Sequence, residues 1–554
     1  MLLQRLIRPF DVCKGLLFFT ETQKKNTMKK TKHHTTLPVL ALAFSLLAAD
    51  GAQAGWIKSY GTKGVEIGTL APSPKGGYYL SAISSPATST TKSAALLSLL
   101  SNQGKPIWTK KITTGAYDTF YLNELNNGRI LLQGTTEVNG GPGDAVWAVY
   151  NVNRSTGALS PVFKKAYKGK GDEQLIITQD NQGILWGTGT TTSFSLNGKS
   201  MDMVLAKIDA NTGIPVWSKV YNYGYDDSVV AFIPKGDNFI LLADSQTATA
   251  DSKKILLGQL NKLGVPVSGS FKEYGGAGLR ISALNIKPIS GGNYLVSGSL
   301  ENNLFDKFPR LFVMKLNSNL GYVWGKSYAG GSDQGLHTAE VNENADQSLT
   351  LTTRLDTALY INIGGQQFPF GALSHPTVIQ LSSNGAVIST KSFEYKEVDS
   401  SGLSRIANGD YLLGGFTSDA IDPNQPAEPQ VDVLYGRFNA AIAPNWVKTL
   451  AGPRLDSGFI KTKSTGYLLS GETMSWGAGN VDVLAGDLDA NGDVPGCPHI
   501  KEVAMTETAP KITATNLNWQ PKAASLIKKG SISSADIVLN VTTGAITTTN
   551  ICSN

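Results

Sequence analysis

The chain has 554 residues, of which 41% are hydrophobic and 17% are charged, and its formal net charge is +6. This balance provides enough apolar side chains for a large core and excludes a wholly disordered protein. At about 150 residues per domain, the length alone suggests three or four domains, and the mild basic excess suggests an anionic partner.

Residues 29–54 have the three parts of a bacterial signal peptide. Three lysines lie between residues 29 and 32, a mostly apolar stretch covers residues 37–49, and Ala52-Gln53-Ala54 is a small-residue cleavage motif. This order predicts export, to the periplasm or as a secreted protein, with Met28 as the start and a cut after Ala54. A long positive region that begins further upstream is the alternative. No later stretch stays apolar for about 18 residues, so we expect no transmembrane span.

The cut would change the charge of the protein. Residues 1–54 carry eight basic and three acidic side chains, so 41 basic and 40 acidic residues remain after them. A protein that binds nucleic acid keeps a basic excess on its surface, because it must neutralise phosphates. We therefore expect no nucleic-acid partner.

A short pattern recurs eight times between residues 55 and 497. Each copy has a lysine, an aromatic residue or serine two positions before it, and an aromatic or aliphatic residue two positions after it. The lysines are 52 to 65 residues apart, at Lys58, Lys110, Lys165, Lys219, Lys272, Lys326, Lys391 and Lys448. The first position holds Trp56, Trp108, Phe163, Trp217, Ser270, Trp324, Ser389 and Trp446. An acidic residue follows most copies, at Asp118, Asp172, Asp226, Asp333, Asp399 and Asp456.

Between successive copies the sequence predicts four short strands, separated by turns rich in Gly, Asn and Asp. No stretch has a helical period of apolar residues. A single four-stranded sheet cannot cover both of its faces, whereas sheets arranged radially around an axis cover one another. The pattern therefore predicts an all-β protein, an eight-bladed β-propeller of four-stranded blades over residues 55–497. Seven blades with one aberrant unit are the alternative.

The recurrence of the tryptophans and lysines indicates a structural role. A ligand site that is used once does not need eight copies, whereas packing between neighbouring blades does. We expect the rings to cover the adjacent sheet and the lysine stems to lie along apolar surface with their ammonium groups in water. We also expect the strand at Trp56 to complete the last blade, because a ninth copy is missing where Cys497 stands.

Two resemblances agree with this architecture. Residues 208–217 (IDANTGIPVW) resemble the repeat of pyrroloquinoline-quinone-type (PQQ-like) propellers, and residues 442–446 and 488–492 match it in part. The eight-fold pattern, over about residues 56–497, is more similar to the bacterial secreted β-propeller repeat family (SBBP-like). That resemblance implies a propeller fold and says almost nothing about function, because many members of the family are uncharacterised.

Residues that could carry chemistry are sparse. After residue 54 the sequence has three histidines, His337, His375 and His499, and no closely spaced pair of the kind that holds a transition metal. No nucleophile elbow of the G-x-S-x-G type comes with suitable partners. We expect the histidines to be loop or packing residues, and we expect no catalytic residue and no cofactor.

A partial calcium motif lies near the end of the repeats. Asp487, Asp489 and Asn491 place oxygen ligands at alternate positions, and Gly492 follows at the sixth position, as in a calcium-binding loop. The twelfth position holds Pro498 instead of a glutamate. The motif is either a calcium site or the strand and turn that recur in the other units.

Residues 498–554 lack the repeat. They are rich in Thr, Ala and Ile and contain alternating stretches that predict strands, and Cys497 and Cys552 lie close to their two ends. In an exported protein two cysteines most simply form one disulfide. Closing a loop of this length would stabilise the fold by about 4 kcal/mol in the chain-entropy view. We expect this tail to fold back on the propeller as a small β-rich appendage.

Two classes of function agree with these residues. The first is an exported, non-catalytic binding or scaffold module, a monomer, that uses a loop face to hold a protein, a glycan or a cell-surface partner. The alternative is a secreted propeller enzyme, either a quinoprotein-like oxidoreductase or a carbohydrate-active protein. The absence of an adjacent Cys-Cys pair from this sequence argues against the quinoprotein. Glycoside hydrolysis needs two carboxyl groups that face each other, most plausibly at a central channel. The sparse chemistry favours the binding module.

Overall fold

The structure is a computed structural model, and its residues Met1–Ala54 and Gly55–Asn554 form two separate units. The described residues are 55–86, 92–137, 142–194, 200–246, 252–276, 278–302, 308–363, 366–418, 430–517, 519, 521–530, 532 and 534–553. The predicted signal peptide therefore lies outside the described residues. No helix in the described part of the chain has the length and apolar character needed to cross a membrane.

The described chain is all-β, with one short 3-10 turn at Ser290–Gly292 (η1). Its strands form six hydrogen-bonded sheets, of which two have ten strands and four have five. Within them the chain runs through groups of four antiparallel strands, which we call units 1 to 8. A single residue pair joins units 4 and 5 (Lys253 and Arg280), and another joins units 7 and 8 (Gly415 and Gly458).

The first four units follow one another directly along the chain. Unit 1 has β2 (Val65–Pro72), β3 (Tyr78–Ser85), β4 (Ala94–Leu100) and β5 (Pro106–Thr113). Unit 2 has β6 (Tyr117–Glu124), β7 (Ile130–Glu137), β8 (Gly143–Val152) and β9 (Leu159–Tyr167). Unit 3 has β10 (Glu173–Gln179), β11 (Leu185–Thr191), β12 (Asp202–Ile208) and β13 (Pro215–Asn222). Unit 4 has β14 (Asp226–Lys235), β15 (Asn238–Gln246), β16 (Lys253–Asn261) and β17 (Lys272–Tyr274).

The second four units end with the strand that begins the described chain. Unit 5 has β18 (Arg280–Pro288), β19 (Tyr294–Glu301), β20 (Arg310–Leu316) and β21 (Tyr322–Ala329). Unit 6 has β22 (Gln334–Glu343), β23 (Leu349–Ile363), β24 (Gln366–Leu381) and β25 (Val387–Glu394). Unit 7 has β26 (Glu397–Arg405), β27 (Tyr411–Ser418), β28 (Val431–Phe438) and β29 (Pro444–Leu450). Unit 8 has β30 (Asp456–Lys463), β31 (Gly466–Thr473), β32 (Asp482–Leu488) and β1 (Trp56–Gly61).

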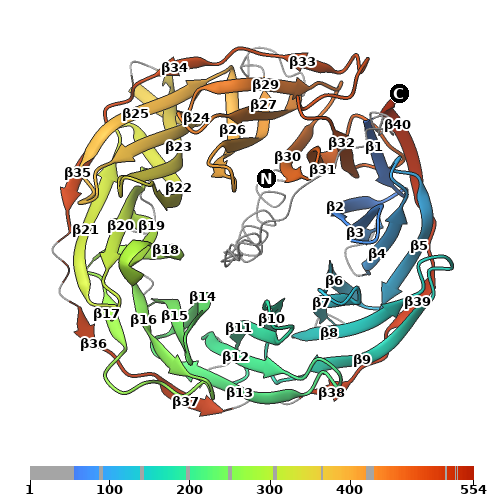
Figure 1. Cartoon of the computed structure of the whole chain (residues 1–554), viewed down its shortest axis with the longest axis horizontal. Coiled ribbons are helices and arrows are strands. Elements are labelled where there is room, and N and C mark those ends of the chain that lie inside the picture. The colour runs from blue at the N-terminus through green and yellow to red at the C-terminus, as the bar shows by residue number, and fades with distance from the viewer. Residues whose placement is uncertain are drawn as a thin grey trace, which may run out of the picture. The chain divides into compact units, whose positions relative to one another are not determined.

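The units succeed one another around a central axis, with the first strand of each unit innermost (Figure 1). β1 pairs with β32 antiparallel, so the start of the described chain completes unit 8, as the position of Trp56 in the sequence predicts. Eight buried apolar clusters lie in this part of the chain, and residues of neighbouring units pack together in them. In a radial arrangement each sheet covers the face of the next one, so both faces of a sheet are buried.

The repeated aromatic residues pack across the unit junctions. Trp56 Nε1 in unit 8 donates a hydrogen bond to the Asn102 carbonyl oxygen in unit 1, at 2.9 Å, and Trp108 Nε1 in unit 1 donates to the Arg154 carbonyl oxygen in unit 2, at 2.8 Å. Each donor reaches the turn between the third and fourth strands of the next unit. These contacts agree with a packing role for the tryptophans.

The turn residue beneath the ring varies with the size of the repeated residue. In the six copies with Trp or Phe, it is a glycine in the left-handed region, with φ between 68° and 77°: Gly104, Gly157, Gly213, Gly264, Gly385 and Gly492. In the two copies with Ser270 and Ser389, the equivalent residues are Leu320 and Ile442, which keep a positive φ and are buried. A large aliphatic side chain therefore fills the space that an aromatic ring fills elsewhere.

The tail is rich in strands and folds back on the units, as predicted, but it extends around all of them instead of forming one small appendage. It has eight short strands: β33 (Ile500–Glu502), β34 (Thr506–Thr508), β35 (Thr513–Asn516), β36 (Lys522–Ala523), β37 (Ile527–Gly530), β38 (Ala535–Asp536), β39 (Asn540–Thr543) and β40 (Thr547–Ser553). They pair in order with the outermost strands of units 7, 6, 5, 4, 3, 2, 1 and 8. Residues 498–553 are thus a belt around the outside of the other units, drawn in orange-red to red in Figure 1.

At least one apolar residue of the belt joins each of the eight buried clusters, and one of them in each cluster follows a regular spacing. These residues are six or seven positions apart, at Met505, Ile512, Trp519, Leu526, Ile532, Leu539, Ile546 and Cys552. The predicted disulfide is confirmed, because Cys552 in β40 is bonded to Cys497, which follows unit 8. The disulfide closes the belt at the unit that contains both β1 and β32.

Candidate functional site

Acidic residues that follow the repeated pattern accept hydrogen bonds from the turns between units. Glu66, Asp118, Glu173 and Asp227 are all buried near the start of the innermost strand. Each accepts a backbone N–H of the preceding turn: Thr62 N–H at 3.0 Å, Thr114 N–H at 2.8 Å, Gly169 N–H at 3.2 Å and Tyr223 N–H at 2.6 Å, respectively. These carboxylates satisfy buried donors, so their recurrence has a structural cause.

Asp118 is one of these buried acceptors, but Asp172 and Asp226 are not, because their neighbours Glu173 and Asp227 are the buried residues. Asp456 is buried as well, and its donors lie at the end of β31 and just after it. Asp456 accepts the hydroxyls of Thr473 at 2.6 Å and Ser475 at 2.7 Å. Burial raises the pKa of Asp456 to about 6 in spite of these donors.

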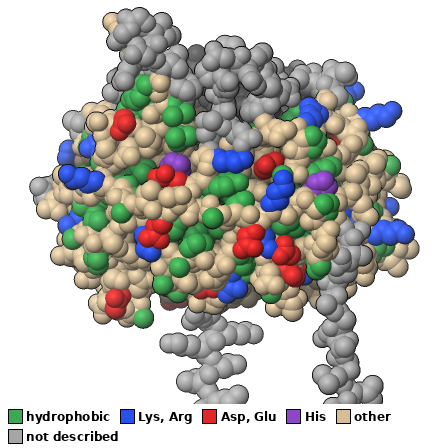
Figure 2. Space-filling model, turned by 90° about the horizontal axis from the view of Figure 1, so that it is seen from above, with side chains coloured by type: hydrophobic (Ala, Val, Ile, Leu, Met, Phe, Trp, Pro, Cys, Tyr) green, Lys and Arg blue, Asp and Glu red, His purple; other side chains and the backbone are tan. Residues whose placement is uncertain are grey.

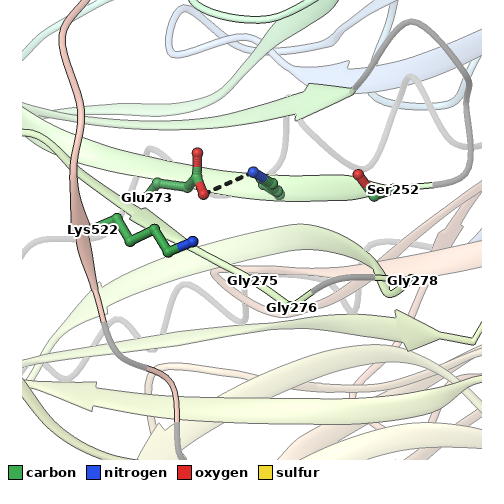
Figure 3. A pocket seen from close by; sticks show the side chains of 7 residues that line it. Ser252, Glu273, Gly275, Gly276, Gly278 and Lys522 are labelled. Carbon is green, nitrogen blue, oxygen red and sulfur yellow. Dashed lines mark hydrogen bonds and ion pairs between the residues drawn. The ribbon is translucent and has the colours of Figure 1, made fainter.

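A cavity of about 400 Å³ lies where the belt crosses unit 4 (Figure 3). Its lining combines two lysines, one glutamate, one serine and a glycine-rich loop: Lys254, Lys522, Glu273, Ser252, Gly275, Gly276 and Gly278. Lys254 lies on β16, Glu273 on β17, Lys522 on the belt strand β36, and the glycines between β17 and β18. The outer strand β17 has only three residues, and two of them pair with the belt strand β36.

The lining of this cavity has two positive side chains and one negative side chain. Lys254 Nζ lies 2.8 Å from Glu273 Oε1, and the Tyr223 hydroxyl donates to Glu273 Oε2 at 2.5 Å. Burial alone would raise the pKa of Glu273, but the hydrogen bonds from Lys254 and Tyr223 and the charges of Lys254 and Lys522 lower it overall. Glu273 is therefore ionised at neutral pH, and its charge is answered by Lys254. The exposed Lys522 leaves the cavity with a net charge of one positive unit.

A second cavity, of about 390 Å³, contains His375. Burial lowers the pKa of His375, although Glu394 and Asp356 act in the opposite direction, so the imidazole is neutral at pH 7. Its Nδ1 has no hydrogen-bond partner among the described residues. Glu394, on the neighbouring strand, accepts the hydroxyl of Thr508 from the belt at 2.8 Å. The neutral and buried state agrees with a packing role for His375.

His337 lies beside a carboxylate that several other groups share. His337 Nε2 is 3.1 Å from Asp356 Oδ2, while Arg354 Nε and Ser374 Oγ lie 2.9 Å and 2.7 Å from Asp356 Oδ1. A serine nucleophile needs the imidazole between the hydroxyl and the carboxylate. Here the carboxylate lies between the hydroxyl and the imidazole, so this arrangement does not activate Ser374.

The two carboxylates of the partial calcium motif have different partners. Asp487 is bonded to Lys463 and to the hydroxyl of Tyr78. Asp489 Oδ1 accepts the backbone N–H groups of Asn491 and Asp493, both at 2.8 Å, which makes a local turn. Protein groups therefore engage both carboxylates of the motif. Among the residues that the structure describes, no group of three or more His, Cys, Asp or Glu side chains could hold a metal ion.

The cavity of Figure 3 could not be found from the sequence. Its residues come from two strands of unit 4, the loop that follows, and a belt strand more than 200 positions later. The run Gly275-Gly276-Ala277-Gly278 signals a loop and nothing more. Lys522 lies beside unit 4 because the belt passes units 7 to 1 in the reverse of their order along the chain.

No protein-family model matches this chain, and no curated protein matches it. The alpha-L-arabinanase of Penicillium chrysogenum is 11% identical over 48% of this chain and 90% of its own, with a TM-score of 0.27. A protein of unknown function from Dyadobacter fermentans is 11% identical over 78% of this chain and 94% of its own, with a TM-score of 0.30. Drosophila Plexin A is 9% identical over 65% of this chain and 85% of its own, with a TM-score of 0.33. Likenesses this low carry no argument about function.

Proposed function

We propose that this chain is an exported eight-bladed β-propeller, cut after Ala54, that works as a non-catalytic binding module. Each of the eight units has four strands of its own and one strand of the belt, which supports the blade count. The repeat over residues 56–497 supports a place among SBBP-like proteins. The disulfide between Cys497 and Cys552 suits an oxidising compartment outside the cytoplasm.

The cavity of Figure 3 is the observation that carries the binding function. Its volume of about 400 Å³ is in the range of small-molecule sites. Its net positive charge and its polar lining suit a ligand with one negative charge on oxygen, such as a sugar that bears a carboxylate or a sulfate ester. Lys522 would make the charge-assisted hydrogen bond to that group.

The same cavity offers little for glycoside hydrolysis. That reaction needs two carboxyl groups, one of them protonated, on either side of the scissile bond. Glu273 is the one carboxylate of the lining, and its lowered pKa keeps it ionised. The carbohydrate-active and quinoprotein-like alternatives therefore have no constellation in this cavity to support them.

Calorimetric titration of the processed protein, residues 55–554, tests the proposal. Sodium glucuronate and sodium sulfate are the probes, and neutral glucose is the control ligand. We expect binding of an anionic probe, and an affinity roughly 10-fold or more lower in Lys522→Gln, because one charge-assisted bond is lost. Lys511→Gln, which replaces an exposed belt lysine outside the cavity, should bind like the parent.

Equal affinities of the Lys522→Gln and Lys511→Gln variants, or no binding of either anion, would contradict this function. Release of a chromophore from an aryl glycoside by the purified protein would replace it with the enzyme alternative.

A further inference from the structure

The junction between units 8 and 1, where the two ends of the ring meet, contains two buried carboxyl groups. Glu66 lies near the start of β2 and is 0% exposed, and Asp482 begins β32 and is 1% exposed. The two residues are held close together, because the Glu66 backbone N–H donates to the carbonyl oxygen of Val481, the neighbour of Asp482, at 2.8 Å. Two buried acids in one place need a counter-charge or a shared proton.

Asp482 is only half satisfied by the protein. Its Oδ2 accepts the Ala478 N–H at 2.6 Å, whereas its Oδ1 has no hydrogen-bond partner in the described part of the chain. Burial, the charge of Glu66 and a hydrogen bond with the Glu66 side chain raise the pKa of Asp482, while the backbone N–H groups of Ala478 and Gly479 lower it. A carboxylate oxygen that is buried without a donor or cation carries a desolvation cost, so its persistence points to a missing ligand.

Other oxygens converge on the same space. A methyl group added at Gly479 would lie within 3.0 Å of Asp482 Oδ1 and of the carbonyl oxygens of Thr62 and Gly64. Because Gly479 has no side chain, these three oxygens can lie close together. Glu66 borders the space, and its Oε1 accepts the hydroxyl of Ser84 at 2.7 Å.

We infer that this junction binds one divalent cation, Ca²⁺ by preference, through the carboxylates of Asp482 and Glu66 and the carbonyl oxygens of Thr62 and Gly64. Ca²⁺ favours carboxylate and backbone carbonyl oxygens and tolerates irregular geometry, whereas zinc prefers nitrogen and sulfur ligands. The cation would cancel the charge of the buried pair and fasten β2 to β32 beside the closing strand β1. The site is separate from the Asp487, Asp489 and Asn491 motif.

The equivalent junction between units 3 and 4 provides an internal control. Asp202, at the start of β12, also has an oxygen without a partner and lies near Asp227. There, Asn222 Nδ2 donates to Asp202 Oδ1 at 2.8 Å, and the charge of Lys529 favours ionised Asp202. Because Asp202 has an amide donor and a nearby cation, we assign no metal ion to that junction.

Native mass spectrometry and thermal unfolding of the processed protein, after treatment with a chelator, test the assignment with CaCl₂ and MgCl₂ as probes. We expect one bound Ca²⁺ per chain and a rise in melting temperature with CaCl₂. Asp482→Asn should lose both responses, while Asp202→Asn and Asp489→Asn should keep both. In chelator, Asp482→Asn should melt no lower than the parent, because it removes an unpaired charge.

Three outcomes would overturn the assignment. One is a parent protein that binds no Ca²⁺ and gains stability only as the pH falls, since the pair would then share a proton. Another is loss of the Ca²⁺ response in Asp489→Asn, which would move the ion to the motif found in the sequence. The third is an unchanged Ca²⁺ response in Asp482→Asn.

Discussion

Single residues in the turns determine how closely one unit approaches the next. Gly104 has a φ of 68°, and a methyl group on its Cα would lie 2.6 Å from the ring of Trp56. An alanine there would suffer both the left-handed backbone and a clash with a rigid ring. The pairing of large rings with glycine, and of Ser270 and Ser389 with Leu320 and Ile442, keeps the volume of each junction filled.

Gly104→Ala should lower the free energy of unfolding by about 2–4 kcal/mol, of which ~1 kcal/mol is backbone strain and the rest is overpacking. Gly236→Ala is the matched control, because Gly236 has a φ of 57° with open space around it. That variant should lose only about 1 kcal/mol. Urea denaturation of both variants measures the difference, and equal losses would show that the contact with Trp56 costs nothing.

Glu472, on β31, makes the stability of the protein depend on pH. Burial raises its pKa to about 7, so the folded state holds a proton on Glu472 that the unfolded state releases. A raised pKa adds stability below the unfolded value, and this stability is lost as the pH rises through about 7. From pH 6 to pH 8, the parent should lose about 1.4 kcal/mol through this group.

Glu472→Gln should remove that part of the pH dependence. Urea midpoints of the parent and the variant at pH 6 and pH 8 provide the measurement. The difference between parent and variant should be larger at pH 8, in favour of the variant. If both proteins lose the same free energy between the two pH values, another group is responsible.

At the scale of elements, the belt is the part of the fold that the sequence analysis missed. Strands and a disulfide are predicted for the tail, and both are present. The belt was hidden because strands such as β36 and β38 have only two residues, too short for any alternating pattern. The spacing of six or seven residues from Met505 to Cys552 predicts one contact at each unit junction, but it is far shorter than the spacing of 52 to 65 residues between the repeated lysines.

The repeat units were predictable for the opposite reason. Each has a hydrophobic pattern long enough to define strands, and eight copies repeat it, so a faulty copy such as the one at Ser270 does not hide the rest. The candidate sites were not predictable, since the cavity with Lys522 and the pair of Glu66 with Asp482 each join segments that are distant in the chain. Each of these sites joins residues from two units, or from a unit and the belt, and neither the alternation within a strand nor the repeat of the units specifies which residues meet.

The apolar belt residues should contribute to stability one by one. Leu539 is 5% exposed within the cluster between units 1 and 2, while its neighbour Val538 is 71% exposed. Leu539→Ala should cost about 2–4 kcal/mol, because a buried leucine leaves a cavity, and Val538→Ala should change stability by less than about 0.5 kcal/mol. Chemical denaturation compares the two variants. Similar small effects would mean that the belt only lies against the surface.

At the scale of the whole unit Gly55–Asn554, the belt and its disulfide enclose the other strands in one covalent loop. The loop leaves unit 8 at Cys497, passes the outer strand of every other unit, and returns as β40 beside β1. On the side that Figure 2 shows, basic and acidic side chains are interspersed, with no large patch of one sign. Strand pairing, the apolar residues in the junctions and the disulfide attach the belt, together with ion pairs such as Lys165 with Asp536 and Lys391 with Glu507.

The disulfide should control how the ring opens. β1 pairs with β32 on one side and with β40 on the other, and the bond between Cys497 and Cys552 ties those two neighbours together. β1 therefore cannot leave the ring by separation of its two flanking strands. The 55-residue separation of the cysteines adds about 4 kcal/mol by restricting the unfolded chain.

A variant with Cys497→Ser and Cys552→Ser should lose about 4 kcal/mol of unfolding free energy and should unfold faster than the oxidised parent. Urea equilibrium curves and unfolding rates measure both effects. The reduced parent should match the double variant, which separates loss of the bond from effects of the serines. The variant should also become sensitive to trypsin within the belt, at residues such as Lys511 and Lys528, before the repeat units are cut. If the units are cut at the same rate as the belt, then the belt and the ring unfold as one body, and the disulfide holds the whole ring and not only its outer strands.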